Sequence, residues 1–473
     1  MVDHPFRLIR AGLLACIALP LALALPACGD DDDDVDGGAT ELPLNPNDHH
    51  HEACADMDRR VVPVTTDMDT DAIFQLFVDA EPGDIIHFEA GRWQMERELS
   101  LDAPCVVLKG AGTTETILDW EGTTSGKGIF VGTGADHFTA EDFTILNTFD
   151  NGLEVRGTEG IIMRRLHVEW TGDAASSNGR YAVYPVECRN LLMEHNVARR
   201  ASDAGIYVGQ CHNAVIRWNV AEENVSGIQV ENTLGAEVYE NLSINNTLGF
   251  LVHDLPNLAT TNGLDTRVYR NAVIANNFQN FANDFDLAFN VPSGTGMIVL
   301  ARDNVEIFDN VFEDNRSVNF AAVNYLLLNP DFDMGSNPDF DVYPRRIHLY
   351  DNTFSGGGDN PDIGRDLGFF LAAIRLQQPA GLDRIPDIVF DNIAPADSTG
   401  DNPLQFCIGD DYDGHVLNLN MDLEALIAED IATLSANLDN EIAPYRCSLD
   451  PVPETPMLET VGPGEGTRPD HNR

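Results

Sequence analysis

The sequence predicts an all-β fold, a parallel β-helix, from two short motifs that recur along the middle of the chain. Glycine followed by alternating apolar residues appears as GIYV, GIQV and GFLV, which succeed one another at intervals of 22 residues from Gly205. A second motif ends in asparagine and appears as MEHN, IRWN and VYEN, which end at Asn196, Asn219 and Asn241. Motifs this short, with alternating apolar positions, are typical of short β-strands. A unit of 22 residues made of such strands and polar turns is typical of one β-helix coil.

The apolar positions of these motifs explain why the coils must stack. One coil alone exposes its apolar side, whereas coils stacked about 4.8 Å apart hide it inside a continuous parallel sheet. We therefore expect three rows of inward side chains across successive coils: Met193, Ile216 and Val238; Val197, Val220 and Leu242; and Ile206, Ile228 and Phe250.

The glycine and asparagine positions predict the corners of the coils. A glycine before a strand permits a tight corner with positive φ. Asparagines stacked on one another can pass amide hydrogen bonds along the axis. The asparagine motif continues at wider spacings of 30 to 42 residues, which suggests inserted loops, and the same row is expected to include Asn271, Asn310, Asn352 and Asn392.

Helices are predicted at both ends, because an open end of a β-helix exposes unpaired strands. The N-terminal helix has Asp69 or Thr70 as its N-cap and one apolar face, formed by Ile73, Leu76, Phe77 and Ala80. The C-terminal helix carries an apolar stripe of Leu423, Leu426, Ile427, Leu434 and Leu438. We assign the β-helix to residues 61–400, its helical cap to 401–450 and a disordered tail, rich in Pro, Gly and Glu, to 451–473.

Residues 1–27 are predicted to be a signal peptide. Arg7 and Arg10 precede an apolar run that is short for a membrane span, and this run ends in LPAC, which resembles a bacterial lipobox. In this interpretation Cys28 becomes the N-terminus and carries a lipid; cleavage of an ordinary secretory signal is the alternative. Residues 28–60 include GDDDDDVDGG and are predicted to be an acidic, disordered tether. We thus expect an exported bacterial lipoprotein at the outer membrane or cell surface, or on the periplasmic face.

The charge balance excludes several classes of partner. Asp and Glu total 77 against 28 Lys and Arg, which gives a formal net charge of −49. A surface this negative repels nucleic acid and anionic membrane, so we expect no nucleic-acid partner and membrane attachment only through the lipid. It also repels uronic-acid polymers unless a divalent cation such as calcium bridges the two sets of carboxylates. A monomer is expected.

The cysteines predict disulfides. Removal of the signal peptide leaves six cysteines besides Cys28 in an oxidising compartment, which permits up to three bonds. Cys188 and Cys211 occupy the same place in successive coils, within CRN and CHN, so a disulfide or a stack of two thiols is expected there. Cys407 and Cys447 flank the C-terminal helix and form the second candidate pair.

Two stretches resemble known β-helix proteins. GDIIHFEAGRWQMERELSLDAPCVVLKGAGTTETIL resembles the first coils of right-handed β-helix proteins of the pectate-lyase superfamily. ASDAGIYVGQCHNAVIRWNVAEENVSGIQVENTLGAEVYENLSINNTLGFLVHDLP resembles, more narrowly, a bacterial group of β-helix-repeat lipoproteins whose activity is not established. The resemblance implies a single-stranded right-handed parallel β-helix with any site on one parallel sheet or in a groove made by longer turns. The catalytic motifs of mannuronan epimerases, polygalacturonases and pectate lyases are absent, so no catalytic set carries over.

Polar residues around the outward positions of the central strands form the candidate site. A lyase or uronate epimerase needs a base beside a carboxylate and a group that quenches the developing charge, and the candidate bases are Tyr184, Tyr207, His167 and Arg180. The candidates to hold calcium, or to serve as the two carboxyls of a glycoside hydrolase, are Glu231 and Asp254. Substrate contacts are expected from Trp170, Gln229, Asn232 and His253. Each residue also has a structural interpretation, as part of a surface tyrosine ladder or as a carboxylate bonded to a corner amide.

Two classes of function remain open. In the first class the chain is a carbohydrate-active enzyme, and a lyase or epimerase is favoured over a hydrolase. In the second class it is a non-catalytic surface protein that binds glycan or a neighbouring envelope protein. A groove with clustered acids, an aromatic strip and a cation favours the first class. A flat, uniformly acidic flank favours the second. The sequence favours a carbohydrate-directed role without indicating turnover.

Overall fold

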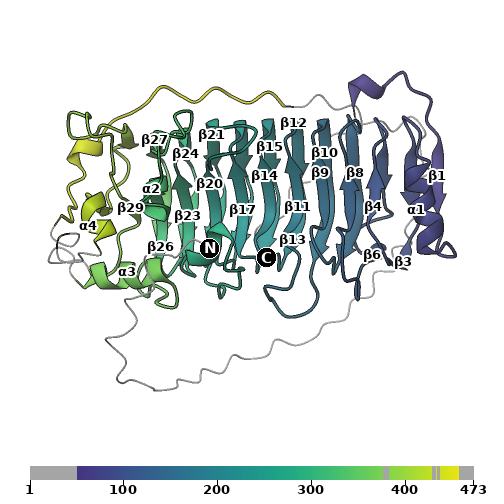
Figure 1. Cartoon of the computed structure of the whole chain (residues 1–473), viewed down its shortest axis with the longest axis horizontal. Helices are drawn as coiled ribbons and strands as arrows, with labels where there is room; N and C mark the ends of the chain where they lie inside the picture. The colour runs from purple at the N-terminus through teal and green to yellow at the C-terminus, as the bar shows by residue number, and fades with distance from the viewer. Residues whose placement is uncertain (1–50, 377–382, 429–432, 434–436, 458–473) are drawn as a thin grey trace, which may run out of the picture.

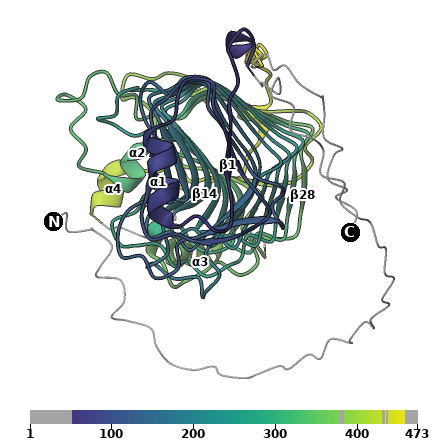
Figure 2. The same ribbon diagram turned by 90° about the vertical axis from the view of Figure 1, so that its right-hand side faces the viewer.

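The computed structural model describes residues 51–376, 383–428, 433 and 437–457, and these residues wind into a parallel β-helix (Figures 1 and 2). Successive coils follow one another along the long axis, and strands of neighbouring coils pair in parallel. The strands form three files around one continuous apolar core. None of the helices in the described part of the chain has the length and apolar character needed to span a lipid bilayer.

One file of strands, which we call face B, forms a sheet of its own. Its members are β4 (Leu99–Leu101), β7 (Ile129–Val131), β9 (Leu153–Arg156), β11 (Tyr181–Val186), β14 (Ala204–Gly209), β17 (Ser226–Glu231), β20 (Leu248–His253), β23 (Thr295–Leu300), β26 (Val318–Val323), β29 (Ile388–Phe390) and β31 (Val416–Asn418).

The two other files share the long strands β8 (Phe138–Leu146) and β10 (Glu159–Glu169), so they count as one sheet. Face A1 continues with β1 (Val61–Val64), β2 (Ile85–Phe88), β5 (Val107–Lys109), β12 (Arg189–Glu194), β15 (His212–Arg217), β18 (Leu234–Tyr239), β21 (Leu264–Tyr269), β24 (Asp303–Phe308), β27 (Arg345–Tyr350) and β30 (Phe406–Ile408). Face A2 continues with β3 (Gly91–Gln94), β6 (Thr116–Asp119), β13 (Val197–Arg199), β16 (Val220–Glu222), β19 (Leu242–Ile244), β22 (Ala272–Ile274), β25 (Val311–Glu313) and β28 (Thr353–Ser355).

Two of the three predicted inward rows are confirmed. Ile206, Ile228 and Phe250 are register partners on face B and are fully buried. On face A1, the register partners Met193, Ile216 and Val238 are likewise buried in the core.

The third predicted row is wrong. Val197, Val220 and Leu242 are register partners on face A2 but point outward and are only half-buried. The residue that follows each of them in the sequence points into the core instead, and these residues are Ala198, Ala221 and Ser243. The cause is the corner before face A2, where the residue before the asparagine adopts a left-handed conformation and the asparagine itself turns inward. By alternation along the strand, the residue after the asparagine then points outward.

The predicted asparagine row exists and forms a buried ladder. Asn196 donates from its amide nitrogen to Oδ1 of Asn219 at 3.0 Å, and Asn219 donates in the same way to Asn241 at 2.9 Å. The ladder continues through Asn271, Asn310 and Asn352. Asn392 is not a member, because it follows β29 on face B and bonds Asn420 instead.

A second asparagine ladder, missed in the sequence, runs along the corner between faces A2 and B. Its members lie five residues after those of the first ladder and donate amide to amide at 3.0–3.1 Å: Asn224, Asn246, Asn276 and Asn315. This ladder corrects the predicted role of the repeated glycines. Gly205 and Gly227 do not have positive φ. A Cβ on Gly205 would come within 2.6 Å of the Asn224 amide nitrogen, so close approach to the ladder requires glycine.

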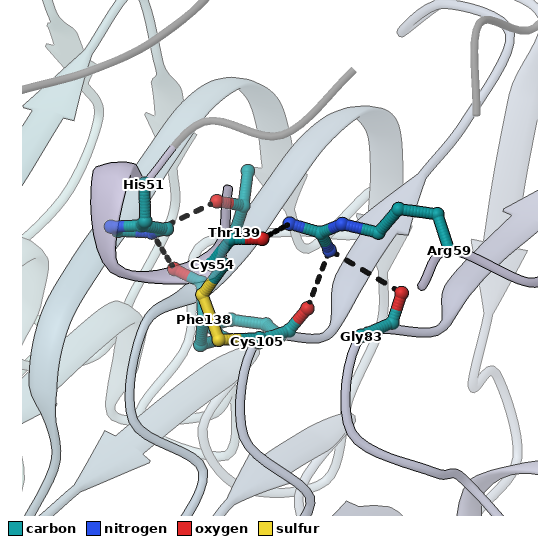
Figure 3. Close-up of a disulfide and its surroundings, with 7 residues drawn as sticks. All are labelled: His51, Cys54, Arg59, Gly83, Cys105, Phe138 and Thr139. Carbon is teal, nitrogen blue, oxygen red and sulfur yellow. Dashed lines mark hydrogen bonds between the residues drawn. A yellow bond between two sulfur atoms is a disulfide. The ribbon is translucent and has the colours of Figure 1, made fainter. Parts of the chain in front are cut away.

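The N-terminal end is closed as predicted, and the ordered region begins earlier than expected. Helix α1 (Thr70–Val78) has Asp69 as its N-cap and buries Ile73 and Phe77 against the first coils. Residues 51–60, predicted to belong to the tether, are ordered: η2 (Glu52–Cys54) is tied to the coils by the disulfide between Cys54 and Cys105. Figure 3 shows the surroundings of this disulfide. On one side the buried His51 ring contacts the Phe138 carbonyl and the Thr139 hydroxyl. On the other side Arg59 donates to the carbonyls of Cys54, Gly83 and Cys105.

The C-terminal end departs from the predicted boundaries. Strands β30 and β31 continue the β-helix past residue 400, and a disulfide joins Cys407 to Cys447 as predicted. Beyond them lie α4 (Leu423–Ile427) and η4 (Ala443–Tyr445), while the predicted stripe residue Leu434 lies outside the described residues. Residues 451–457, predicted to be disordered, run back along the outer side of face A1 (Figure 1). There the Thr455 N–H donates to Glu237 at 2.9 Å, which holds this part of the tail.

From β20 onward, inserted segments cover the outer side of face B. Residues 276–294, which include η3 (Leu287–Asn290), pack Phe281 and Val291 against Leu251. Farther along the axis, a second apolar cluster forms between the outward side chains of the strands and two short helices, α2 (Tyr325–Leu328) and α3 (Asp366–Arg375). Only the earlier coils of face B therefore keep a polar outer side.

Candidate functional site

The outward side chains of face B change character along the axis. In register from the N-terminal side they are Phe130, Glu154, Tyr184, Tyr207, Gln229, Leu251, Ile298, Ala321 and Val389. The row is polar and aromatic as far as Gln229 and apolar from Leu251 on. We call the first stretch, with the side chains that contact it, the polar part of face B.

Three tyrosines form the centre of this polar part. Tyr184 stacks on Tyr181 with ring centroids 4.4 Å apart and contacts Tyr207 in the next coil at 4.7 Å. Tyr181 and Tyr184 are half-buried, whereas Tyr207 is 3% exposed. Burial raises the pKa of Tyr184 to about 12, so its phenol is protonated at neutral pH. Two rigid aromatic rings therefore stand at the surface on a strand scaffold.

Arg180 holds two buried carboxylates beside these rings. Its Nη2 donates to Asp203 at 2.9 Å and to Asp286 at 2.6 Å, so the two carboxylate oxygens lie within about 5.5 Å of each other. Asp203 also accepts from the Tyr181 hydroxyl at 2.8 Å and from the Gln229 amide at 3.2 Å. Burial raises the pKa of Asp286, and the charge of Asp203 adds to this effect. Both carboxyl groups face protein donors, and the Asp286 side chain is fully buried.

A second charged group lies on the N-terminal side of the tyrosines. Glu154 is buried and accepts from Asn151 at 2.8 Å and from Arg156 at 3.2 Å, with the Lys127 amine at 3.4 Å. Arg156 also donates to the exposed Glu187 at 2.8 Å. Each of the cations Lys127, Arg156 and Arg180 is thus paired with carboxylates.

Tyr207 leads to a buried chain of polar groups. Its hydroxyl donates to Glu231, whose other oxygen lies 3.4 Å from Nε2 of His253. All three side chains are at least nine-tenths buried, and Nδ1 of His253 has no partner among the described residues. The predicted residues Tyr207, Glu231 and His253 are therefore brought together, but beneath the surface.

Asp254 and Asn232 anchor a loop. Asp254 binds Arg302 at 2.7 Å through one oxygen and the Gly263 N–H at 2.7 Å through the other. Asn232 donates to the carbonyls of Leu255, Thr260 and Thr261. The proposed pair Glu231 and Asp254 is divided between two separate networks. In the described ranges, no group of three or more His, Cys, Asp and Glu side chains is arranged to hold a metal ion.

The predicted residues His167 and Trp170 lie away from the polar part of face B. His167 is on β10 in face A2, where its ring bonds Glu169 at 2.8 Å and lowers the pKa of that carboxyl. Trp170 is 5% exposed and donates from its indole to the Thr148 carbonyl at 2.7 Å, so it is part of the core. Neither side chain contacts the tyrosine cluster.

Several residues of the polar part were not predicted from the sequence, among them Glu154, Tyr181, Asp203 and Asp286. Tyr181 is the first residue of β11 and pairs in register with Ala204, and Asp203 directly precedes that position in the next coil, so alignment of the coils offers a sequence signal. Glu154 is the outward residue of GLEV, so strand alternation would also have found it. Asp286 comes from the inserted segment 276–294 and breaks the repeat, so no spacing identifies it.

Comparisons with known proteins agree with the geometry of the coils. The family model described as a right handed beta helix region matches residues 116–263 and 151–337. No curated protein matches the chain.

Several solved structures are similar at low identity. They include the A-module of the mannuronan C-5 epimerase AlgE4 of Azotobacter vinelandii, with 15% identity, a TM-score of 0.41 and coverage of 65% of this chain and 83% of that chain. An exopolygalacturonase of Thermotoga maritima has 11% identity, a TM-score of 0.42 and coverage of 63% and 80%. An alginate lyase of a Paenibacillus species has 12% identity, a TM-score of 0.35 and coverage of 64% and 97%.

Proposed function

We propose that the polar part of face B binds a polysaccharide in this chain, which is a right-handed parallel β-helix repeat protein. The observation that carries the proposal is the pair of half-buried tyrosines, Tyr181 and Tyr184, stacked 4.4 Å apart and flanked by Arg156 and Arg180. Aromatic rings pack on the apolar faces of sugars, and flanking polar groups bond sugar hydroxyls. Strand-borne rings lose little side-chain freedom on binding, which favours affinity.

Charge favours a neutral polysaccharide over a uronic-acid polymer. Lys127, Arg156 and Arg180 are already paired with Glu154, Asp203 and other carboxylates. A sugar carboxylate would have to displace one of these partners and would meet the field of a chain whose net charge is −49. Neutral hydroxyls face neither cost.

The protonation states favour binding without turnover. A base that removes a sugar proton works best with a pKa near the ambient pH, and the pKa of Tyr184 is raised to about 12 by burial. Asp203 and Asp286 have the spacing of a carboxyl pair, but they lie beneath Arg180 and the inserted segment and bond protein donors. We assign them the role of positioning Arg180 and Tyr181.

Export and lipid attachment through Cys28 complete the proposal. The acidic stretch between Cys28 and residue 51 would act as a spacer that lets the β-helix reach polysaccharide of the cell envelope. Metabolic labelling with a radioactive fatty acid should mark the wild-type protein and leave Cys28→Ser unlabelled.

Binding can be tested by calorimetry on a panel of neutral and uronic-acid polysaccharides, with and without calcium. Tyr184→Ala should weaken binding to the best neutral polymer about tenfold, since an aromatic contact contributes about 0.5–1.5 kcal/mol beyond its buried area. The matched control is Tyr269→Ala, which removes a stacked tyrosine from face A1. No binding across the panel, or equal losses in the two variants, would refute the proposal. Release of reducing ends or unsaturated products would show turnover and refute its non-catalytic part.

A further inference from the structure

An apolar cavity lies on face B next to the polar part. Its volume is about 80 Å³, and it lies between the outward side chains of β20 to β29 and a cover formed by residues 287–292 and α3. The residues that define it include Leu251, Leu287, Ile298, Ala321, Leu371 and Val389. Thr295 brings the one hydroxyl of the lining, and that hydroxyl already donates to the Pro292 carbonyl at 2.8 Å.

The chemistry of the cavity selects an aliphatic ligand. A water molecule needs two to four polar partners, and this lining offers none that is free, so water is held weakly. A volume of about 80 Å³ is about half of the roughly 150 Å³ of a cavity that holds a benzene molecule, so it corresponds to a chain of about three methylenes.

The cavity and the polar part of face B are neighbours on the same sheet. Leu251 in the cavity is the register partner of Gln229, which bonds Asp203. On the covering segment, Leu287 in the cavity immediately follows Asp286, which bonds Arg180. One ligand can therefore place a polar portion on the tyrosines and an apolar portion in the cavity.

The covering segment also exposes an apolar side chain at this junction. Phe285 is 71% exposed, although it precedes the buried Asp286, and the Arg180 guanidinium lies 5.5 Å from its ring. An exposed aromatic ring between a polar and an apolar site can cover an alkyl chain that passes from one to the other.

We infer that the ligand is a glycan with an aliphatic substituent, either an acylated sugar or the head of a glycolipid, whose alkyl chain enters the cavity. This inference rests on the proposed function and specifies the substrate class of the same site. The sugar lies on Tyr181 and Tyr184, and the chain passes Phe285 toward Leu251 and Leu287.

Alkyl β-glucosides with chains of one to ten carbons, kept below their micelle-forming concentrations, test the inference by calorimetry on the wild-type chain. The dissociation constant should fall about fourfold per added methylene, as burial of a methylene predicts, and level off at about three to five carbons when the cavity is full. The n-alkanols of the same lengths measure the contribution of the chain without a sugar.

Variants separate the two portions of the ligand. Ala321→Leu fills part of the cavity and should reduce the dependence of binding on chain length; Val323→Phe, two residues farther along β26, gives a second filling. Val311→Leu, on the exposed side of face A2, is the matched control and should behave as wild type. Thermal unfolding of each variant shows that it is folded.

The outcomes distinguish this inference from the proposed function. If polysaccharides bind but chain length has no effect, the polysaccharide site stands and the inference is overturned. If glucosides and alkanols show the same dependence and Tyr184→Ala changes neither, the cavity binds alkyl chains alone, and the joint site is overturned. A dependence lost in both filled variants, together with weaker glucoside binding by Tyr184→Ala, supports the inference.

Discussion

At the scale of single residues, the asparagine side chains carry the corner hydrogen bonds. Each amide donates both to the next asparagine and to a backbone carbonyl of a preceding strand, as Asn219 does to Asn241 and to Met193. These groups are fully buried, so a missing partner is not replaced by water. The repeated asparagine is therefore a structural residue.

Asn219→Ala should lower the free energy of unfolding by about 2–5 kcal/mol, because it leaves the buried N–H groups of Asn196 without their acceptor. Urea denaturation measures the change. The control is Asn360→Ala at an exposed position, which should be neutral. Equal stability of the two variants would contradict the role of the ladder.

Asp391 makes stability depend on pH. It is fully buried, and burial raises its pKa to about 7 despite N–H donation from Asn324 and Ile393. In the unfolded chain the same carboxyl has a pKa of about 3.9. The folded state therefore holds the proton more tightly, and this contribution to stability is present below about pH 4 and is lost as the pH rises to about 7.

The difference in unfolding free energy between wild type and Asp391→Asn should change by about 3 kcal/mol in favour of the variant from pH 4 to pH 7. Urea denaturation at several pH values gives this difference. The exposed Asp359→Asn should show no such trend. A difference that stays constant across this range would disprove the assignment.

At the scale of elements, strands and corners constrain one another. The glycine near the start of the central face B strands leaves room for groups of the next coil: a Cβ on Gly227 would come within 2.3 Å of the Ser243 hydroxyl and 2.6 Å of the Gly249 carbonyl. The motif GIQV thus combines an inward apolar pair with a position that tolerates no side chain.

Gly227→Ala should destabilise the protein by about 1–3 kcal/mol through overpacking. The matched control is Gly172→Ala, where an added Cβ meets nothing within 4 Å, and its effect should stay within about 0.5 kcal/mol. Thermal and urea unfolding compare the two. Equal stability of the two variants would show that crowding at Gly227 is relieved by movement of the neighbouring coil.

At the scale of the whole molecule, ion pairs between coils oppose a large net charge. Arg217 binds Glu194 at 2.7 Å and Arg267 binds Glu306 at 3.1 Å, each between neighbouring coils of face A1. Pairs of this kind contribute about 0–1 kcal/mol each, whereas the net charge of −49 acts on every coil. Self-repulsion should dominate.

The unfolding temperature should therefore rise by a few degrees when NaCl is increased from about 10 mM to 0.5 M, because the Debye length falls below the spacing of unpaired carboxylates. Differential scanning calorimetry measures the shift, and KCl in place of NaCl should give the same result. A falling unfolding temperature would mean that the ion pairs outweigh the repulsion.

The coils were predictable because their motifs repeat, whereas the positions at which the pattern breaks were not predictable. Ile206, Ile228 and Phe250 follow from alternation within one motif, and the pairing of Cys188 with Cys211 follows from equal positions in successive coils. Val197 failed because a left-handed corner shifts the alternation by one residue. Asn392 failed because a motif of the same letters lies on another face.

The candidate site was predictable only in part. Tyr184, Tyr207 and Gln229 were found because outward positions recur with the coil, and Arg180 was found because it lies in an enlarged polar turn. Their partners Asp203 and Asp286 were missed, and the burial of Glu231 and Asp254 was not foreseen, because it depends on side-chain contacts between neighbouring coils.

The sequence by itself determined the coil, two of its three inward rows, the N-terminal capping helix and two of the disulfides, because a repeated local pattern has one way to bury its apolar side. Only the tertiary structure decided which outward residues stay accessible and which segments cover face B. Those features depend on where nonrepeating insertions fold back, as Asp286 does onto Arg180, and contacts between residues 106 positions apart leave no periodic trace in the chain.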